Sequence, residues 1–389
     1  MPSRARQDIH DFVTSHRGPI LSLLEEMVGC NSFSHNKAGV DAVAAMIGRH
    51  VPPRFSHQVF RQNELGDHHV YSWLPPGAAK SIVLAGHLDT LCPPDPSFNS
   101  LVDRGETLHG PGVNDMKSGD VVLIWAVKAL DALGLLDRLP LTIIFNGDEE
   151  IGSPTSNAIF SGMAGKASAA LVFECGGPEG TVVTTRKGVT RQRLHITGAP
   201  SHFGNLKGAK VSAVLEAAHK IIAIEALNRP DKSVVANAGR VEGGLAANAV
   251  AEKAVIDFEA RYWTPEIEAE TRKAIASLVS APAVPGCSLR VEQLSFRPPM
   301  RPTPQSMRLF HTIVALAASM GETIIEEKRG GVSDACWLSH AGIPTVDGLG
   351  PLGDHDFTPK EYITKETLFR RIELTANLLI EMRQAGFLA

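Results

Sequence analysis

The chain has 389 residues, of which 43% are hydrophobic and 21% are charged. This size is typical of a globular enzyme with about two domains, each large enough to bury its own core. The net charge of −4 provides no basic field for a nucleic acid or an anionic membrane, and no apolar stretch approaches the roughly 18 residues of a membrane span. The polar N-terminus does not resemble a signal peptide, so we expect a cytoplasmic protein with no nucleic-acid or membrane partner.

Residues 8–182 alternate helical and strand patterns. The predicted helices lie near residues 8–27, 40–49 and 120–133, and the predicted strands lie near Phe60, Ile82, Ile143 and Val172. This alternation is typical of a parallel or mixed sheet with helices on both faces. We therefore predict an α/β fold for this part of the chain.

Residues 190–297 follow a different pattern. The predicted strands span residues 191–197, 236–241, 254–261 and 288–294, and the predicted helices span residues 207–227 and 265–279. The resulting order, β-α-β-β-α-β, is that of a ferredoxin-like domain. A proline-rich linker at 296–304 follows, and helices over residues 306–320 and 365–384 return to the first pattern. The small domain is therefore predicted to be an insertion into a discontinuous larger domain.

Three apolar runs of the first part end in polar side chains that can bind metals. His87 and Asp89 end one run, Glu149 and Glu150 end the next, and Glu174 ends the third. In open α/β sheets the ligand crevice lies at the carboxyl ends of the strands. We therefore expect these side chains to meet at one rim of the sheet.

Two further residues, each in a glycine-flanked segment, complete a set of five metal-type side chains. The set is His87, Asp115, Glu150, Glu174 and His355. A single histidine or strand-end carboxylate is more often a surface residue or a helix cap. The joint occurrence of three polar strand ends and two glycine-flanked residues favours a two-metal hydrolase.

Five motifs, in this order, resemble those of the M20 metallopeptidase family. They are His87-Leu-Asp89, Gly110-Pro-Gly-Val-Asn-Asp115-Met-Lys-Ser-Gly119, Asp148-Glu149-Glu150-Ile-Gly152, Ser201-His202-Phe-Gly204 and Gly330-Gly-Val-Ser-Asp334-Ala. The match covers nearly the whole chain. It is strongest with the glutamate carboxypeptidases, and acetylornithine deacetylases and succinyl-diaminopimelate desuccinylases are related members.

The resemblance implies a zinc-peptidase-like, three-layer α/β/α catalytic domain formed by residues 1–185 and 298–389. A ferredoxin-like α+β lid and dimerisation domain, residues 186–297, is inserted into it. The resemblance also implies two zinc ions per chain, with cobalt or manganese as alternative metals. By the same resemblance His87 and Glu174 hold one ion, Glu150 and His355 hold the other, and Asp115 bridges them.

Two carboxylates beside the predicted ligands receive catalytic roles. Two metal ions roughly 3.5–4 Å apart can lower the pKa of a bridging water and polarise the scissile carbonyl. Glu149 is predicted to take the proton of that water and pass it to the leaving nitrogen, as general base and then acid. Asp89 is predicted to orient His87 through its second ring nitrogen. The competing interpretation makes Glu149 a surface acid that only adjoins a ligand.

His202, in the inserted domain, is predicted to donate a hydrogen bond to the developing oxyanion. The resemblance suggests that it reaches the active site of the other subunit. The open sheet edge of a ferredoxin-like domain can pair across a two-fold axis, which protects the edge. We therefore predict a homodimer whose active sites are completed in trans.

Further residues are predicted to bind the substrate by their match to family motifs. They are Asn248, Arg261, Gly331 and Ser333. The planar guanidinium of Arg261 suits a substrate carboxylate because it can bind both oxygens. Alternatively, Arg261 is a strand-end cation that pairs with Glu259 or Asp257.

Three functions compete at this point. The first is a zinc carboxypeptidase that releases a C-terminal, acidic, glutamate-like amino acid from a small peptide or an N-acyl conjugate. The second is an N-acyl-amino-acid deacylase or desuccinylase, which uses the same metals and differs in what the pocket holds on either side of the amide. The third is a binding or scaffold protein that has lost its metals, and the complete ligand set with Glu149 argues against it.

Overall fold

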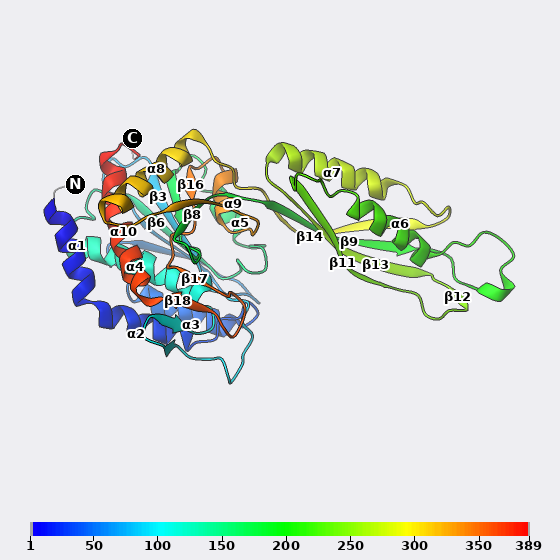
Figure 1. The fold of residues 1–389 in the computed structure, drawn as a ribbon, viewed down its shortest axis with the longest axis horizontal. Helices are drawn as coiled ribbons and strands as arrows, with labels where there is room; N and C mark the ends of the chain where they lie inside the picture. Colours follow the sequence, from blue (N-terminus) through cyan, green and yellow to red (C-terminus); the bar gives the residue numbers. More distant parts are fainter. Residues whose placement is uncertain (1–2, 388–389) are drawn as a thin grey trace. The chain divides into compact units, whose positions relative to one another are not determined.

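The computed structural model describes residues 3–387, which form two compact units (Figure 1). The first unit comprises residues up to Thr184, Pro302–Lys328 and residues from Ser333 onward. The second comprises Thr185–Arg301 and Arg329–Val332, so it is inserted into the first. The short segment Arg329–Val332 is a part of the second unit that the sequence did not indicate. None of the helices within residues 3–387 combines the length and apolar character needed to cross a membrane.

A six-stranded sheet forms the centre of the first unit. Its order is β1 (Ser56–Phe60), β2 (His68–Trp73), β6 (Leu141–Asn146), β3 (Ser81–His87), β7 (Ala167–Val172) and β16 (Thr345–Val346). Strand β3 is parallel to both neighbours, β6 and β7, whereas β2 is antiparallel to β6. Every residue of β3 and β6 is buried, so helices cover both faces of the sheet. This confirms the predicted mixed sheet, although β2 was not predicted.

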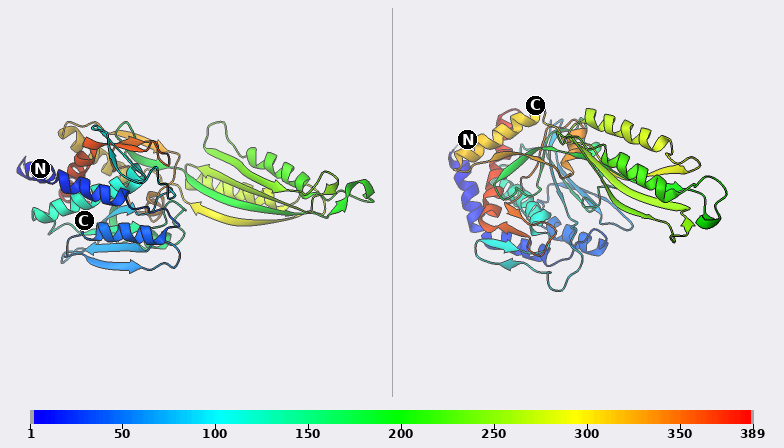
Figure 2. Two further views of the ribbon diagram at one scale, coloured as in Figure 1. Left: turned by 90° about the horizontal axis from the view of Figure 1, so that it is seen from below. Right: turned by 45° about the vertical axis from the view of Figure 1, so that its right-hand side comes forward.

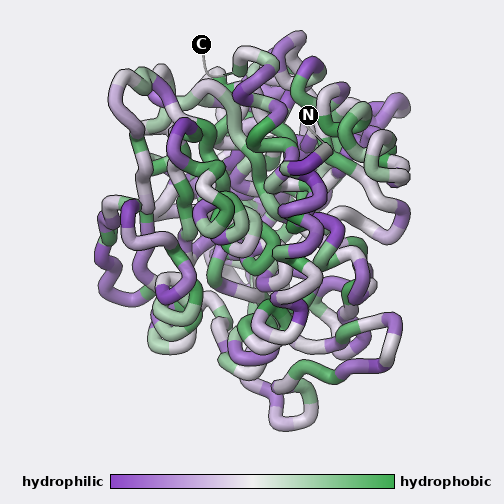
Figure 3. The backbone as a smooth tube through the Cα atoms, turned by 90° about the vertical axis from the view of Figure 1, so that its left-hand side faces the viewer, coloured by the Kyte–Doolittle hydropathy of each residue, from purple (hydrophilic) through white to green (hydrophobic). Residues whose placement is uncertain are grey.

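Eight α-helices surround this sheet in the described part of the first unit. They are α1 (Ser3–Ser15), α2 (Arg17–Val28), α3 (Lys37–Gly48), α4 (Ser118–Ala132), α5 (Asn157–Ser161), α8 (Pro304–Ser319), α9 (Ala335–His340) and α10 (Lys365–Gln384). In Figure 3 the helix beside the N label, α1, is mostly hydrophilic, as expected for a surface helix with few buried residues such as Ile9 and Val13. The core on the inner side is apolar and includes Trp125, Phe145 and Phe369.

The single helix predicted near residues 8–27 is wrong, because the chain breaks at His16 into α1 and α2. His16 has non-helical backbone angles, and its Nδ1 lies 2.8 Å from the carbonyl oxygen of Phe12. Pro19 follows in the first turn of α2, where its missing N–H is tolerated, whereas a continuous helix would need that donor.

Two smaller sheets flank the central one. The first has the order β17 (Gly353–Asp354), β18 (Tyr362–Thr364), β5 (Thr107–His109) and β4 (Val102–Asp103). The second pairs β15 (Ile325–Arg329) with β8 (Thr181–Arg186). The first of these sheets joins two distant parts of the sequence, since β5 leads into the loop that carries Asp115 and β17 leads directly into His355.

The second unit is a four-stranded antiparallel sheet with two helices. Its elements are β9 (Gly188–Thr197), α6 (Ala213–Glu225), β11 (Val234–Gly243), β13 (Lys253–Tyr262), α7 (Pro265–Ser280) and β14 (Ser288–Arg297). The sheet order β11-β13-β9-β14 and the chain order β-α-β-β-α-β confirm the ferredoxin-like prediction. Both helices pack on the same face of the sheet, around a core that includes Ile256 and Phe258 (Figure 2).

The predicted start of α6 at residue 207 is wrong. The helix begins at Ala213 because Ser212 caps it, with the Leu215 amide donating to the Ser212 hydroxyl at 3.3 Å. Before it, β10 (Ser201–His202) pairs with β12 (Ala249–Val250), and a 3₁₀ turn, η2 (Phe203–Asn205), follows.

Candidate metal centre

The carboxyl ends of the three parallel strands meet at one rim of the central sheet. His87 is the last residue of β3, the Glu149–Glu150 turn follows β6, and Glu174 follows β7. Since β3 lies between β6 and β7, its histidine stands between the two acidic strand ends. The predicted rim is therefore present, and its arrangement follows from the strand order.

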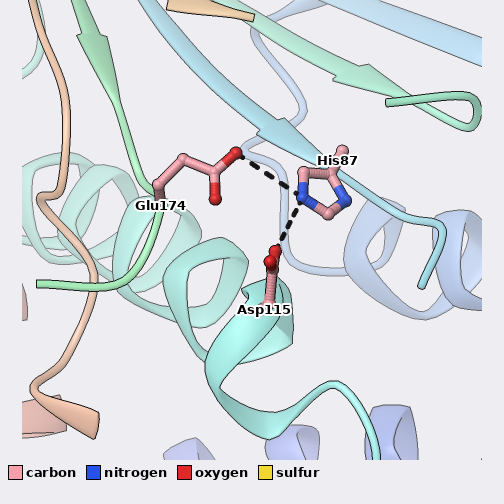
Figure 4. Close-up of side chains that lie close together, drawn as sticks. All are labelled: His87, Asp115 and Glu174. Atoms are coloured by element: carbon pink, nitrogen blue, oxygen red, sulfur yellow. Dashed lines mark hydrogen bonds and ion pairs between the residues drawn. The ribbon is translucent and has the colours of Figure 1, made fainter. Parts of the chain in front are cut away.

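A cluster of His87, Asp115 and Glu174 forms the centre of this rim (Figure 4). His87 Nε2 lies 3.1 Å from Asp115 Oδ1 and 3.6 Å from Glu174 Oε1. One ligand atom from each residue lies within 4.8 Å of the other two. Figure 4 shows the two carboxylates reaching the same ring nitrogen from the end of β7 and from the Asp115 loop. This spacing and donor set fit a divalent metal ion.

The orientation of His87 depends on Asp89. The Nδ1 atom of His87 lies 2.9 Å from the backbone carbonyl oxygen of Asp89 and 3.6 Å from its Oδ1. Nδ1 therefore carries the proton and donates to the carbonyl, which leaves Nε2 directed at the acids. Burial opposes a charge on His87, yet the carboxylates of Asp115 and Asp89 raise the pKa of its imidazole well above the ordinary value. A metal ion at Nε2 would compete with a proton.

The carboxylate of Asp89 has another set of partners. It accepts hydrogen bonds from the backbone amides of Glu149, at 3.1 Å, and Glu150, at 3.2 Å. The hydroxyl of Ser34 donates to it at 2.7 Å. The side chain therefore fixes the acidic turn against the end of β3, while the backbone of the same residue makes the shorter contact with His87.

Burial and, after it, mutual repulsion of carboxylates determine the electrostatics of the rim. Burial, and after it the charge of Asp115, raises the pKa of both Glu150 and Glu174 well above the ordinary value, and Glu149 adds to the shift of each. Glu149 and Glu174 are buried, Glu150 is partly buried, and His87 is the cation in their midst. Divalent cations would relieve this repulsion, so the residues present fit a metal centre.

A buried hydrogen-bond network around Asp148 supports the Glu149–Glu150 turn. The Asp148 carboxylate accepts from the Thr155 amide at 2.8 Å and from the Thr155 hydroxyl at 2.7 Å. The Gly147 amide donates to Nδ1 of His68 at 3.2 Å, so His68 is neutral and its Nε2 donates to the Thr155 hydroxyl at 2.8 Å. Burial lowers the pKa of His68, in agreement with the neutral form. The sequence analysis missed His68 because this residue lies in β2, a strand that was not predicted.

The loop that carries Asp115 is held by Glu361. The Glu361 carboxylate accepts from the backbone amides of Gly112 at 3.0 Å, Asn114 at 2.8 Å and Asp115 at 3.1 Å. Burial raises the pKa of Glu361 to about 7, although these amides oppose the shift. On the other side of the loop, Lys117 donates to the carbonyl oxygen of Cys30 at 3.0 Å.

His355 lies outside the three-residue cluster. Its side chain is exposed, and its ring centroid is 6.0 Å from that of Tyr362. The backbone has φ of 66°, and the Asp354 carboxylate and the Thr358 hydroxyl hold it through hydrogen bonds of 2.7 and 2.8 Å. A left-handed backbone at a residue other than glycine is uncommon and concentrates at functional sites. The role of His355 as a metal ligand stays a prediction.

Asp120 is a buried acid that the sequence reasoning missed. Both carboxyl oxygens lie in the protein interior and have no hydrogen-bond partner among residues 3–387. The side chain packs under the end of β3, where a Cβ atom added to Gly86 would lie 2.0 Å from Asp120 Oδ1. Burial raises the pKa of Asp120 well above the ordinary value. Glycine at position 86 therefore allows the Asp120 carboxyl group to sit directly beneath the strand that ends in His87.

His202 and Asn248 come together at one end of the second unit. Both are exposed, and both line a cavity of about 680 Å³ formed by the β10–β12 pair and the residues around it. The strand register places His202 opposite Ala249, next to Asn248. The two residues therefore share one surface of the second unit.

Two of the predicted substrate-binding residues already have protein partners. Arg261 Nε donates to Glu259 at 2.8 Å, and its Nη1 donates to the carbonyl oxygen of Gly330 at 2.9 Å. The alternative pairing with Glu259 is therefore the one present in the structure. Ser333 is fully buried, and its hydroxyl donates to Asp347 at 2.6 Å.

Gly331, the fourth predicted substrate-binding residue, belongs to the segment Arg329–Val332 of the second unit. Its carbonyl oxygen accepts from Nη1 of Arg186 at 3.2 Å, and the carbonyl of Val332 lies 3.4 Å from the same nitrogen. The segment is therefore tied to the β8–β9 region by its backbone.

Comparisons with a family model, with the sequences of known proteins and with solved structures point to the same family. A model of the peptidase family M20/M25/M40 matches residues 83–381. Carboxypeptidase G2 from Pseudomonas sp. (strain RS-16) is 24% identical over 382 residues, which cover 95% of this chain and 90% of that protein. Succinyl-diaminopimelate desuccinylase from Variovorax paradoxus (strain S110) is 25% identical over 330 residues, which cover 76% of this chain and 82% of that protein. The crystal structure of a dinuclear metal-binding peptidase of the M20 family from Bacillus subtilis has a TM-score of 0.71 at 15% identity, and the match covers 95% of this chain and 99% of that one.

The family match extends over most of the chain and confirms the resemblance found in the five motifs. The α/β unit with its ferredoxin-like insertion has the fold of the M20 peptidases. The chain therefore belongs to the peptidase family M20/M25/M40 and is a metal-dependent hydrolase.

Proposed function

We propose that the protein is a dizinc hydrolase that cleaves an amide bond and releases a C-terminal amino acid from a peptide or an N-acyl conjugate. The observation that carries the proposal is the approach of one imidazole and two carboxylates, from His87, Asp115 and Glu174, to within 4.8 Å of one another. The similarity to carboxypeptidase G2 over 95% of the chain supports a carboxypeptidase.

In this proposal the two ions would be held by a set of five residues. They are His87, Asp115, Glu150, Glu174 and His355. When bound, the ions lower the pKa of a coordinated water and polarise the scissile carbonyl. Glu149 would serve as the general base that takes a proton from the water nucleophile and delivers it to the leaving nitrogen. The hydrogen bond that the Glu149 backbone amide donates to the Asp89 carboxylate, at 3.1 Å, supports this role because it fixes the backbone of Glu149 beside the acid cluster.

We propose an acidic, glutamate-like residue as the released amino acid, with its carboxylate bound by Arg261. Two guanidinium groups, those of Arg191 and Arg261, already share the Glu259 carboxylate, at 2.9 and 2.8 Å. In this proposal a carboxylate of the substrate takes the place of Glu259 as the partner of Arg261. Glu259 stays paired with Arg191, so its charge remains neutralised. This exchange of partners breaks one charge-assisted hydrogen bond at a partly exposed site, so the free energy that it requires is modest.

We also propose a homodimer in which His202 acts in the active site of the partner chain. Large apolar side chains are exposed on the second unit, among them Ile222 on α6, Val241 on β11 and Leu245 beside the cavity of His202. Strands β11 and β14 are the edges of their sheet. Apolar exposure and open edges are features that a symmetric interface would cover.

An N-acyl-amino-acid deacylase is the second candidate. It is supported by the similarity to succinyl-diaminopimelate desuccinylase over 76% of the chain. Both reactions require the same metals and the same base, so the site residues do not separate them.

A substrate panel tests the proposal. Dipeptides and N-acyl amino acids with each C-terminal residue would be supplied to the protein loaded with zinc, cobalt or manganese, with His87→Ala as the control. We expect His87-dependent release of a C-terminal acidic residue from peptides. Preference for acetyl or succinyl conjugates of basic amino acids would favour the deacylase, and no metal-dependent hydrolysis of any member would contradict both candidates.

A further inference from the structure

Glu361 is a buried carboxylate outside the predicted set of site residues. It is 1% exposed, and it receives three backbone N–H groups from the segment Gly112–Asp115. One oxygen, Oε1, accepts from the consecutive amides of Asn114 and Asp115, and the other accepts from Gly112. A carboxylate that accepts from the amide of Asp115 itself fixes the peptide plane from which the Asp115 side chain projects.

The position of Glu361 in the fold connects two segments that carry predicted metal ligands. It immediately precedes β18, and Tyr362 of β18 pairs with His109 of β5, from which the chain enters the Asp115 loop. Tyr362 also pairs with Asp354 of β17, which directly precedes His355. The hydrogen bonds of Glu361 and the pairing of β18 thus attach both segments to the same short stretch of chain.

We infer that Glu361 is a positioning residue that holds the Asp115 loop in its metal-binding conformation and couples it to the segment of His355. The inference rests on the proposed metal-dependent function. Glu361 itself is not a ligand in this account, since its two oxygens are occupied by backbone amides at 2.8–3.1 Å. Groups that orient metal ligands in this way commonly change metal affinity about 10–100-fold when they are removed.

Glu361→Gln is the informative change because it preserves the shape of the side chain. A glutamine has one carbonyl oxygen and one NH₂ group, so at least one backbone N–H would face a second donor. The loop would have to move to relieve this contact, and Asp115 would move with it. Glu361→Asp keeps both acceptor oxygens but shortens the side chain, and it serves as a second variant.

The second unit provides a matched control. Glu216 is also fully buried, and its carboxylate accepts from the backbone amides of Ala283 at 3.1 Å and Val284 at 2.6 Å. Glu216→Gln therefore removes the same kind of interaction, together with an ion pair to Lys220 at 3.3 Å, from a unit that contributes none of the five predicted ligands. Thermal unfolding of both glutamine variants separates a loss of stability from a loss of metal affinity.

The experiment measures zinc affinity of the full chain by competition with a chromogenic chelator, together with the cobalt absorption spectrum and thermal unfolding of the metal-free protein. We expect Glu361→Gln to bind zinc about 10–100-fold more weakly and to change the cobalt spectrum, while Glu216→Gln binds zinc like the wild type. Glu361→Asp should recover part of the affinity, and it decides the question if the glutamine variant does not fold.

Zinc affinity and a cobalt spectrum like those of the wild type in folded Glu361→Gln would overturn the inference, and so would an equal loss of affinity in Glu216→Gln. If Glu361→Gln does not fold, an unchanged zinc affinity and cobalt spectrum in Glu361→Asp would overturn it, because the shorter side chain cannot hold the three loop amides at the same distances. Failure of the proposed function has a different signature. In that case the wild type would bind zinc and Glu361→Gln would bind zinc more weakly, but neither protein would hydrolyse any member of the substrate panel.

Discussion

The open face of the second unit and the rim of the central sheet in the first unit use acidic side chains in opposite ways. On the open face of the second unit each acid has basic partners: Asp257 bonds to Arg193 at 2.6 Å, and the pKa of Asp257 is lowered mainly by this hydrogen bond. At the rim of the first unit the pKa values of Glu150 and Glu174 are raised, because burial and neighbouring acids outweigh the single imidazole. A self-compensated acid needs no further partner, whereas a buried cluster with excess negative charge must take up protons or bind a cation from outside.

The largest effect that this comparison predicts is the loss of turnover in Glu149→Gln. The change removes the proton acceptor and leaves the five predicted ligands in place, so kcat should fall by about a hundredfold to ten-thousandfold with bound metal retained. Steady-state kinetics and metal analysis of the same sample measure both quantities. A loss below about tenfold would assign the base to another residue.

Mixing two inactive variants tests whether His202 of one chain acts in the active site that contains Glu149 of the partner chain. Glu149→Ala and His202→Ala proteins should each be inactive, and a heterodimer formed by subunit exchange would contain one site with both residues intact. With statistical exchange and independent sites, activity should return to about a quarter of the wild type. Exchanged mixtures that stay inactive, or a fully active monomer in sedimentation, would exclude action in trans.

A compensated acid in the first unit provides the corresponding stability test. Burial alone would raise the pKa of Asp67, but hydrogen bonds from Lys37, the Gln62 amide and Arg61 lower it to about 2. Asp67→Asn should therefore reduce the free energy of unfolding by about 1–2 kcal/mol at neutral pH.

The pH dependence of this Asp67 effect follows from the direction of the shift. A lowered pKa gives stability that is complete above the unfolded-state value, near 3.8, and is lost as the pH falls through about 2. Denaturant titrations of wild type and Asp67→Asn should therefore converge between about pH 4 and pH 2. A difference that stays constant over this range would mean that the charge of Asp67 is not the cause.

The smallest effect is expected on the open face of the second unit. Asp257→Asn removes one partner of Arg193 and Arg240, but the pairs are partly exposed, so unfolding free energy should change by less than about 1 kcal/mol. The effect should shrink further in high salt, as monitored by chemical denaturation. A loss of several kcal/mol would show that this network is more than a set of surface pairs.

Much of the framework was predictable from the sequence because it depends on local patterns. Continuous apolar runs identified β3, β6 and β7, and α10 spans residues 365–384 as predicted. In contrast, β2 begins His68-His69 and contains Ser72, so its apolar pattern is interrupted. Its burial comes from pairing with β6, which no local pattern reveals.

The missed parts of the site share a similar cause. Glu361, His68 and Asp120 act through contacts with distant segments, and none stands in a motif that marks it. The role of Asp89 was predicted for its side chain, but its backbone carbonyl makes the shorter contact with His87, and its carboxylate binds the acidic turn instead. Sequence spacing can bring residue types to one rim, but hydrogen-bond partners depend on the packed loops.

Metal content of the wild type and of Asp115→Ala is the most direct test of the central claim that the acidic rim requires cations. After equilibrium dialysis against zinc, the wild type should contain about two ions per chain, and Asp115→Ala should lose at least one of them along with its activity. Glu259→Ala, which removes a compensated acid of the second unit, should keep both ions. A wild type that binds no zinc, or an Asp115→Ala protein that keeps two ions and full activity, would contradict the account.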